Sequence, residues 1–446
     1  MLGYLLCAAA LITSYFFSTR SLRAGLYAVL TIGYAYGIVR ANVRDSGAYF
    51  IFDFALLGLF AGRAGLAVSG RQLNRETKLR QWLWLVAAWP LLLLAIPNQD
   101  PWVRLVGFRA QVFFLPFFIF GARLESEDLF GIAKCCALLN LIALGFALTE
   151  YSIGIALFYP TTVITEIMYN SHDVVGENFR IPATFSSAHA YAGTLVMTLP
   201  FILGAIHQRS TRGGATTLLI GGVFAAAIGT FIAAARVHAA ILLVLLLLTS
   251  RSLLVRFGGM ARLALVVVVV ITGLVVADNP RMQRFTLLAD TQAVQQRVGV
   301  SMNKSLWEYA AEYPLGNGLG GGGTSMPYFL RDRLKDTVSI ENQYGTILLE
   351  LGLPGLLLWT ALLVWTVLRG GRVYKGSWNV TQRSARVAVV CYSIAGGIGT
   401  GMFTSVPQSC LLMLAMGWLC ADDRVGYQSY GEARSVNRPP LGLGRA

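Results

Sequence analysis

The sequence predicts an all-α polytopic membrane protein with about 12–13 transmembrane helices and a large periplasmic loop that contains an amphipathic helix. Of the 446 residues, 55% are hydrophobic and only 13% are charged, and the mean hydropathy is +0.60. Soluble globular domains carry about 25% charged residues. A helix needs about 20 mostly apolar residues to cross the hydrocarbon core, and stretches of this kind recur along the whole chain.

The apolar stretches place the spans in order. The predicted spans are 1–18, 24–41, 48–68, 81–97, 107–123, 129–150, 187–206, 216–235, 237–250, 261–277, 344–368, 387–405 and 407–420. Two of them, 1–18 and 237–250, are short for a full crossing. The predicted units are N-terminal transmembrane helices in 1–150, a first long periplasmic loop in 151–186, central transmembrane helices in 187–277, a large periplasmic loop in 278–343, C-terminal transmembrane helices in 344–420 and a disordered cytoplasmic tail in 421–446.

The net charge of +14 has a topological explanation. Lys and Arg concentrate in cytoplasmic loops, and the basic clusters of this chain lie between apolar stretches. With residues 69–80 in the cytoplasm, alternation places the later basic clusters inside and the loops 98–106, 151–186 and 278–343 outside. No interleaving of basic and aromatic residues suggests base stacking, so no nucleic-acid partner is expected.

The six cysteines all lie in or at the ends of apolar stretches. None has the spacing of a metal site, so they are interpreted as small core side chains. Neither a metal nor another cofactor is predicted.

Within the large loop, residues 291–313 predict the amphipathic helix. Apolar residues recur there every four positions, at Val294, Val298, Met302, Leu306 and Ala310. Arg297 lies off that stripe, and Pro314 with Gly316 ends the helix. We expect this helix to rest on the bundle at the membrane interface.

Two arginines stand out at the predicted outer face. Arg236 closes an apolar segment within AAARVHAA, among small residues that leave room for an anion. The ordinary alternative is an arginine that snorkels at a hairpin. Arg180 lies just before a membrane helix, where guanidinium would suit a phosphate and where a solvated loop arginine is equally common. Arg297 is a weaker candidate of the same kind, because charge is expected on a polar helix face.

Glu341 and Asn342 stand where the chain re-enters the membrane, followed by Tyr344. Helix capping is the simpler explanation for this pair, because Asn is a good cap and acidic residues suit helix starts. Glu350, deeper in the same helix, is expected to be a buried partner for an arginine. Asp53 is an isolated carboxylate in the third span and a functional candidate, and Arg40 or Arg44, which are near in sequence, is its expected partner.

The glycine-rich run 316–323, with Gly318 and Gly320, is similar to a phosphate cradle but lacks the ending of a P-loop. Flexible backbone against a lipid headgroup is the plainer interpretation. His189 and His238 lie next to Arg180 and Arg236 at the outer boundary. Each is more often a satisfied polar residue than a catalytic base.

The order of these pieces resembles the O-antigen ligase/polymerase superfamily of bacterial polysaccharide assembly. The resemblance lies in Arg180 before ATFSS, in Arg236 at a hairpin, in the Pro-Leu-Gly-x-Gly-Leu-Gly run 314–320 and in Glu-Asn-x-Tyr at 341–344 before a helix with Glu-x-Gly-x-x-Gly. It covers about residues 175–360 of this chain. Ligases of the superfamily typically have histidine where this chain has Glu341, so the match is closer to the Wzy-type polymerases.

The resemblance implies a metal-independent membrane glycosyltransferase of GT-C-like type in the bacterial inner membrane, with its site facing the periplasm. Its donor and acceptor would be oligosaccharide repeat units linked to undecaprenyl diphosphate. Arg180 and Arg236 would stabilise the leaving diphosphate, and Glu341 would orient or deprotonate the acceptor hydroxyl. Substrate contacts are expected from the remaining candidates, which are Asn342, Tyr344, Arg297, His189, His238, Gly318 and Gly320. Membrane lipid, chain-length regulators and export proteins are further expected partners.

Two other functions stay open at this point. A ligase that transfers glycan to lipid A core differs only in its acceptor. A transporter of lipid-linked oligosaccharide is less well supported, because transporters usually show repeats and charges near the midplane. This chain has no evident repeat and concentrates its polar residues at one predicted face.

Overall fold

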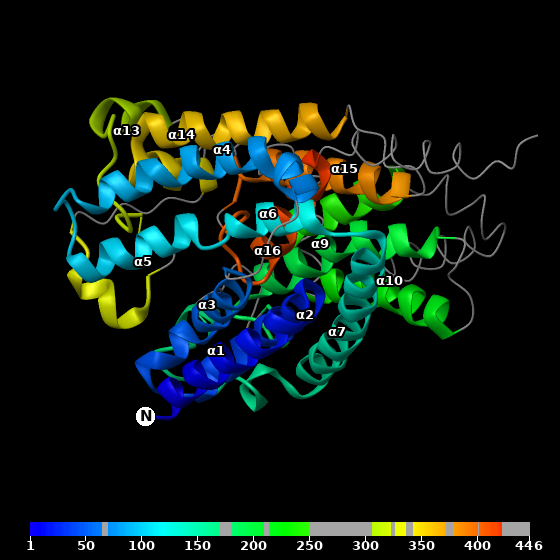
Figure 1. The fold of residues 1–446 in the computed structure, drawn as a ribbon. Coiled ribbons are helices and arrows are strands. Elements are labelled where there is room, and N and C mark those ends of the chain that lie inside the picture. The colour runs from blue at the N-terminus through cyan, green and yellow to red at the C-terminus, as the bar shows by residue number, and fades with distance from the viewer. Residues whose placement is uncertain are drawn as a thin grey trace, which may run out of the picture.

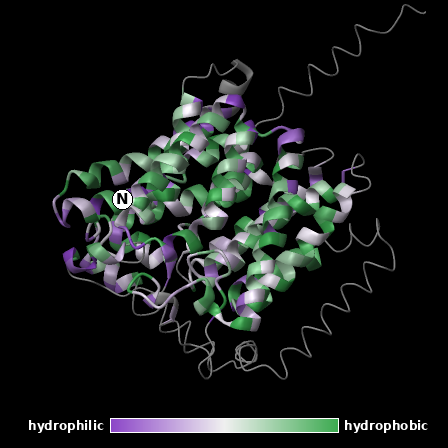
Figure 2. Ribbon diagram, turned by 90° about the horizontal axis from the view of Figure 1, so that it is seen from below, coloured by the Kyte–Doolittle hydropathy of each residue, from purple (hydrophilic) through white to green (hydrophobic). Residues whose placement is uncertain are grey.

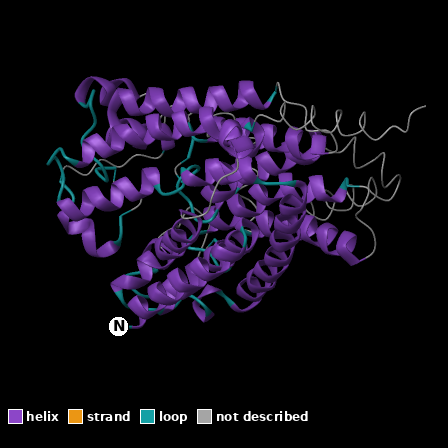
Figure 3. Ribbon diagram, viewed as in Figure 1, coloured by secondary structure: helices purple, strands orange, loops and turns teal. Residues whose placement is uncertain are grey.

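The computed structural model describes residues 1–64, 70–169, 180–208, 214–248, 306–322, 326–335, 342–371, 378–399 and 401–421. All regular elements in these ranges are helices (Figure 3). Among them, 8 helices are long and apolar enough to cross a membrane. The prediction of an all-α polytopic membrane protein is therefore confirmed. The span 261–277, most of the loop 278–343 and the tail from 422 onward lie outside the described residues.

The N-terminal helices pack through small residues. Helices α1 (Leu2–Arg20) and α2 (Leu22–Asn42) are followed by the short helix η1 (Ser46–Phe50) and by α3 (Ile51–Ala64). A Cβ atom added at Gly58 of α3 would lie 2.3 Å from the carbonyl oxygen of Leu11 in α1. Small residues at such crossings let membrane helices approach closely.

The next four helices run from the blue to the teal part of Figure 1: α4 (Gly70–Leu94), α5 (Pro101–Val112), α6 (Pro116–Arg123) and α7 (Ser126–Ile153). Helices α5 and α6 form one broken crossing, with Pro116 at the start of its second half. The predicted cytoplasmic loop 69–80 is helical from Gly70 onward, because its Gln, Leu, Arg, Glu and Lys residues are good helix formers.

Helix α9 (Ala188–Ile206) is the most buried of the long helices and contacts α7, α10, α15 and α16. It follows the short helices η2 (Ile155–Leu157) and α8 (Glu166–Tyr169). Helix α10 (Gly214–Ile232) and the helix Arg236–Leu248 then form a hairpin. Buried residues fill almost the whole length of α9, which places it in the centre of the bundle.

The C-terminal part contains α13 (Leu306–Glu312), η4 (Tyr328–Arg333), α14 (Gln343–Gly370), α15 (Asn379–Ala395) and α16 (Gln408–Cys420). In Figure 1, α14 lies beside α4 and α13, and α16 lies beside α6. Helix α14 is broken at Gly352, whose φ is 66° and whose ψ is −170°. Helix α13 ends before Pro314, as predicted, and the rest of the predicted amphipathic helix 291–313 lies outside the described residues.

The helices begin and end at two opposite ends of the bundle, and contacts between the connecting segments show which helix ends lie together. We call these the first end and the second end. At the first end, Ile38 N donates to Thr184 O at 3.2 Å and Gln343 N donates to Gly396 O at 2.8 Å. At the second end, the Trp378 indole donates to Ser126 Oγ at 3.1 Å. Figure 2 shows hydrophobic residues along most of each long helix between these ends. The described parts of the predicted outer loops lie at the first end. It remains a prediction that this end faces the periplasm.

Candidate functional site

Arg180 and His189 meet at the first end, where the chain enters α9. Arg180 Nη1 lies 3.1 Å from His189 Nε2 and 3.3 Å from Nδ1. Guanidinium has only donors, so the accepting ring nitrogen must carry no proton. His189 is exposed and Arg180 is half-buried, so both side chains border solvent. The sequence prediction that these two residues are neighbours agrees with this geometry.

The segment that carries Arg180 is held by buried groups around Ala183. Ala183 has a φ of 51°, in the left-handed region that alanine rarely adopts. Its N–H donates to Glu150 Oε2 at 2.9 Å, and its carbonyl accepts from the Tyr159 hydroxyl at 2.7 Å. Ser187 then caps α9 by accepting from Ala190 N at 3.1 Å. Sequence reasoning missed Glu150 and Tyr159, although a lone carboxylate that ends a long apolar stretch was a signal for the first.

Arg236 is the first residue of the helix Arg236–Leu248, after a turn in which Ala234 has a φ of 51°. A cation at a helix N-terminus is disfavoured by the helix dipole. Helix stability therefore does not account for an arginine at this position. The predicted hairpin at Arg236 is observed, and the side chain is half-buried.

His238, in the first turn of the same helix, is 1% exposed. Its ring centroid lies 6.2 Å from that of His189 and 6.0 Å from that of Tyr392 in α15. Neither ring nitrogen has a hydrogen-bond partner among the described residues. His238 thus connects the segment of Arg180 to the helix that begins with Arg236.

A glycine makes room for the next contact. The Tyr392 hydroxyl donates to Gly193 O at 2.8 Å, and Gln408 Nε2 donates to Met402 O at 2.8 Å. A Cβ atom on Gly193 would lie 1.7 Å from Gln408 Oε1 and 2.9 Å from His238 Nε2. Only a residue without a side chain lets Gln408 and His238 both reach α9 at this point. None of Gly193, Tyr392 and Gln408 was predicted.

The start of α14 is joined to the same region through the connection 396–407. Asn342 caps α14, because its side chain accepts from Gly345 N. Gln343 N donates to the carbonyls of Gly396 and Gly399, and the Tyr344 hydroxyl donates to Ser393 O at 2.6 Å. Glu341 lies outside the described residues, as does Arg297. The neighbour of Glu341, Asn342, is 1% exposed.

The glycine-rich run packs against the break in α14. Gly316, Gly318 and Gly320 have φ values of 90°, 98° and 82°, and Asn317 N donates to Leu349 O at 2.6 Å. Leu353 N, just past the break, donates to Pro314 O at 2.9 Å. The described part of the run is therefore fixed on α14. Gly318 and Gly320 are buried, and their contact with substrate stays a prediction.

The side chain of Glu350 in α14 lies against this glycine-rich run. Its carboxylate accepts from Gln111 Nε2 at 3.0 Å and from the backbone amides of Gly320 and Gly322, and the residue is 3% exposed. Among the described residues Glu350 does not pair with an arginine, contrary to the prediction, because the glycine backbone comes close enough to supply donors instead. The group held by the glycine-rich run is a side chain of the protein itself.

Asp53 also has a different partner from the predicted ones. Arg109 Nη1 in α5 lies 2.6 Å from Asp53 Oδ2, which makes Arg109 its ion-pair partner in place of Arg40 or Arg44. Arg40 instead stacks on the ring of Tyr49, with 4.0 Å from its Cζ atom to the centroid. The prediction was wrong because it took partners near in sequence.

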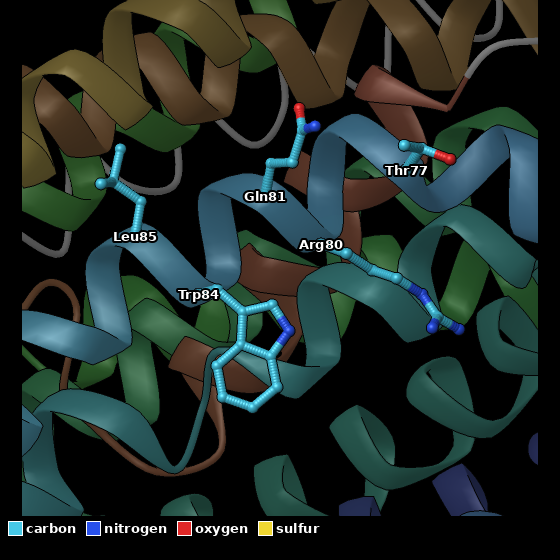
Figure 4. A pocket seen from close by; sticks show the side chains of 5 residues that line it. All are labelled: Thr77, Arg80, Gln81, Trp84 and Leu85. Carbon is cyan, nitrogen blue, oxygen red and sulfur yellow. The ribbon is translucent and has the colours of Figure 1, made fainter.

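Two cavities lie away from these residues. One, of about 690 Å³, is lined among the described residues by side chains of α4, which are Thr77, Arg80, Gln81, Trp84 and Leu85 (Figure 4). Trp84 is 69% exposed, as expected of a helix surface that faces lipid. The other cavity lies at the second end. In the described part of the chain, no group of three or more His, Cys, Asp or Glu side chains is arranged to hold a metal ion.

Comparison of the chain with protein-family models and with curated proteins finds no match in either set.

Proposed function

We propose that the protein is an inner-membrane polysaccharide polymerase that joins oligosaccharide repeat units linked to undecaprenyl diphosphate on the periplasmic face. The observation that supports it is that three segments far apart in sequence, 180–189, 236–238 and 342–344, are linked by contacts at one end of a helical membrane bundle. Two of these segments carry arginines, and the third directly follows Glu341.

In the proposed reaction, the acceptor hydroxyl oxygen attacks the anomeric carbon of the donor sugar. The bond between that carbon and the diphosphate oxygen breaks, and its electron pair leaves with the diphosphate. The proton of the hydroxyl passes to the Glu341 carboxylate. Arg180 and Arg236 stabilise the negative charge that develops on the diphosphate, because cations that are already in position need little reorganisation during the reaction.

The His189 contact adds a condition to this proposal. Arg180 is oriented by a ring nitrogen that must be unprotonated to accept its N–H. Protonation of His189 turns that contact into a repulsion between two cations. His189 is therefore a positioning residue for Arg180. The ring of His238 contacts the ring of His189 edge-on, with 6.2 Å between their centroids.

The test is reconstitution of purified protein with a lipid-diphosphate-linked repeat unit, with the products resolved on a gel. The wild type is compared with Glu341→Ala and Arg236→Ala. The matched control is Arg333→Ala, because this arginine at the same end is 53% exposed and lies 3.8 Å from Asp100. Exposed pairs of this kind contribute at most about 1 kcal/mol to stability.

We expect a ladder from the wild type and from Arg333→Ala, and no ladder from the other two variants. Transfer of a single unit only when lipid A core is supplied would assign a ligase. Absence of transfer to any acceptor, by a folded protein, would overturn the proposal in favour of a transporter.

A further inference from the structure

A cavity of about 560 Å³ lies at the second end of the bundle, where four helix ends meet. Its walls come from the first turns of α2, the first turns of α7, the residue after the C-cap of α9 and the residue before α15. It is separated by the length of the helices from Arg180, Arg236 and Asn342, which all lie at the first end. The proposed polymerase chemistry therefore does not involve it.

Two cations line this cavity. Arg23 donates from Nη1 to the Glu127 carbonyl at 3.3 Å, and its Nε lies 4.0 Å from Asp128 Oδ1. Lys134 lies over the ring of Phe130, with 4.9 Å from Nζ to the centroid. No described carboxylate lies within ion-pair distance of Lys134. Arg23 is thus partly neutralised, and Lys134 is the stronger attraction for an anion.

The position of Lys134 fits a membrane interface. It stands eight residues after Ser126, the first residue of α7, so its Cα lies about 12 Å along the helix. Helical side chains point toward the N-terminus, and a lysine stem can carry its ammonium further in that direction. The Lys134 ammonium lies over Phe130, one turn nearer to the start of α7, so the charge is closer to the second end of the bundle than its backbone is. Ionisable residues at such positions are rare unless they have a function.

The other walls are aromatic. Tyr27, Phe130 and Trp378 border the cavity, and Trp378 is held by its hydrogen bond to Ser126. A Cβ atom on Gly131 would lie 2.1 Å from the Tyr27 hydroxyl, so glycine is needed for α2 and α7 to approach here. Tyrosine and tryptophan are typical of the zone where acyl chains meet headgroups. The cavity thus offers a polar and an apolar side to one occupant.

The charges of the lining suit a monoanion. Asp128 lies 4.0 Å from Arg23 and partly neutralises it, whereas Lys134 has no described carboxylate within ion-pair distance, so one cation of the lining remains available to an anion. A lipid phosphodiester carries one negative charge. Basic pockets between transmembrane helices on the cytoplasmic side are known to bind phospholipid headgroups. From this geometry we propose that the cavity binds the phosphodiester headgroup of a membrane phospholipid, with Lys134 as the main contact and Arg23 as the second.

The experiment is native mass spectrometry of the purified full-length protein titrated with phosphatidylglycerol, phosphatidylethanolamine or diacylglycerol. The first two lipids contain a phosphodiester and the third does not. The variants are Lys134→Gln and Lys134→Arg. The matched control is Arg20→Gln, because Arg20 also ends near the second end and stacks on an aromatic ring, with 4.2 Å from its Cζ atom to the Phe16 centroid, but does not line the cavity.

We expect a saturable adduct of one phospholipid on the wild type, on Arg20→Gln and on Lys134→Arg. In Lys134→Gln the affinity should fall by at least about fivefold, as expected for the loss of one basic residue near a lipid surface. Equal affinity of Lys134→Gln and wild type, or equal retention of diacylglycerol and phosphatidylglycerol, would overturn the proposal. If Lys134→Gln does not fold, Arg23→Gln takes its place, and unchanged binding there would count against the site. The lipid-binding assay does not depend on glycan transfer. Absence of lipid binding would therefore not contradict the proposed polymerase function, and absence of transfer would not contradict the proposed lipid site.

Discussion

Replacement of Gly193 by alanine tests the contact on which the first end depends. The added Cβ atom would lie 1.7 Å from Gln408 Oε1 and 2.9 Å from His238 Nε2, and both side chains are only 1% exposed. Moving the Gln408 amide away from Gly193 also moves the Nε2 atom that donates to Met402 O. His238 is buried with its ring centroid 6.0 Å from that of Tyr392 in α15, so its displacement would disturb this packing.

The magnitude follows from three contributions. Overpacking a dense interior costs about 1–3 kcal/mol. A buried amide that loses its partner costs roughly 1–3 kcal/mol more. Alanine regains about 1 kcal/mol over glycine in helix propensity. We therefore expect Gly193→Ala to lower the free energy of unfolding by roughly 1–5 kcal/mol.

The assay is thermal unfolding in detergent, followed by tryptophan fluorescence. Gly221→Ala is the control, because a Cβ atom there would lie an ordinary 3.6 Å from Leu141 and the residue is also in the interior of a helix. Gly221→Ala should match or slightly exceed the wild type. In Gly193→Ala, the second change Gln408→Ala removes the colliding atom and should restore part of the lost stability, so the two effects would not add. Equal melting temperatures for the two glycine variants would refute the close approach at Gly193.

Three further perturbations address separate contacts. Asp53→Ala leaves the Arg109 charge without its partner and should destabilise the protein by up to about 3 kcal/mol in the same thermal assay. An unchanged melting temperature would contradict the importance of this ion pair. Glu350→Leu removes the group that accepts hydrogen bonds from the amides of the glycine-rich run, so limited proteolysis within residues 306–335 should become faster. Unchanged cleavage would show that other contacts hold the run in place. Burial raises the pKa of Tyr159 well above its ordinary value, so its contribution to stability is complete below about pH 10 and is lost as the pH rises toward the folded-state pKa. The stability difference between wild type and Tyr159→Phe should therefore shrink above about pH 10, and a difference that grows there would contradict the assignment.

The helices could be predicted because each apolar stretch is a local property of the sequence. The breaks within them were less accessible. The span predicted at 344–368 is a single apolar stretch, yet α14 changes direction at Gly352, where Leu353 N bonds to Pro314 O of a distant segment. Pro354 nearby was a local signal for a disturbance, but it does not say which segment fills the gap.

The candidate site divides in the same way. Arg180 and His189 are nine residues apart, so their contact could be anticipated from the sequence. Gln408 and Gly193 come from α16 and α9, and no periodicity relates them. Asp53 shows the opposite error, because the nearest arginines in sequence were not the nearest in space. Pairings of distant residues depend on helix packing, which apolar patterns do not encode.

Two buried carboxylates at the first end share a feature that bears on the arginines there. Glu150 accepts from the backbone amide of Ala183, and Glu350 accepts from Gln111 and from glycine amides. Asp53, also at the first end, pairs instead with Arg109, and at the second end the fully buried Glu76 accepts from two arginines, at 2.6 Å from Arg123 and 2.8 Å from Arg80. A carboxyl group that accepts from amides leaves the charge of a guanidinium available, whereas one that accepts from arginines offsets it.

Glu150 fixes the segment that carries Arg180 through a backbone amide. Glu150 holds Ala183 by its N–H while Tyr159 holds it by its carbonyl, so the backbone three residues after Arg180 is fixed from both sides. That fixation costs the strain of a left-handed alanine, of order 1–3 kcal/mol, which a buried network must offset. Replacing Ala183 by glycine would relieve the strain and keep both hydrogen bonds. If the anchor serves only stability, Ala183→Gly should unfold at a higher temperature with unchanged transfer. If it orients Arg180 toward the leaving diphosphate, the added freedom should lower the transfer rate in a protein of equal or greater stability, and the reconstituted gel assay separates the two outcomes.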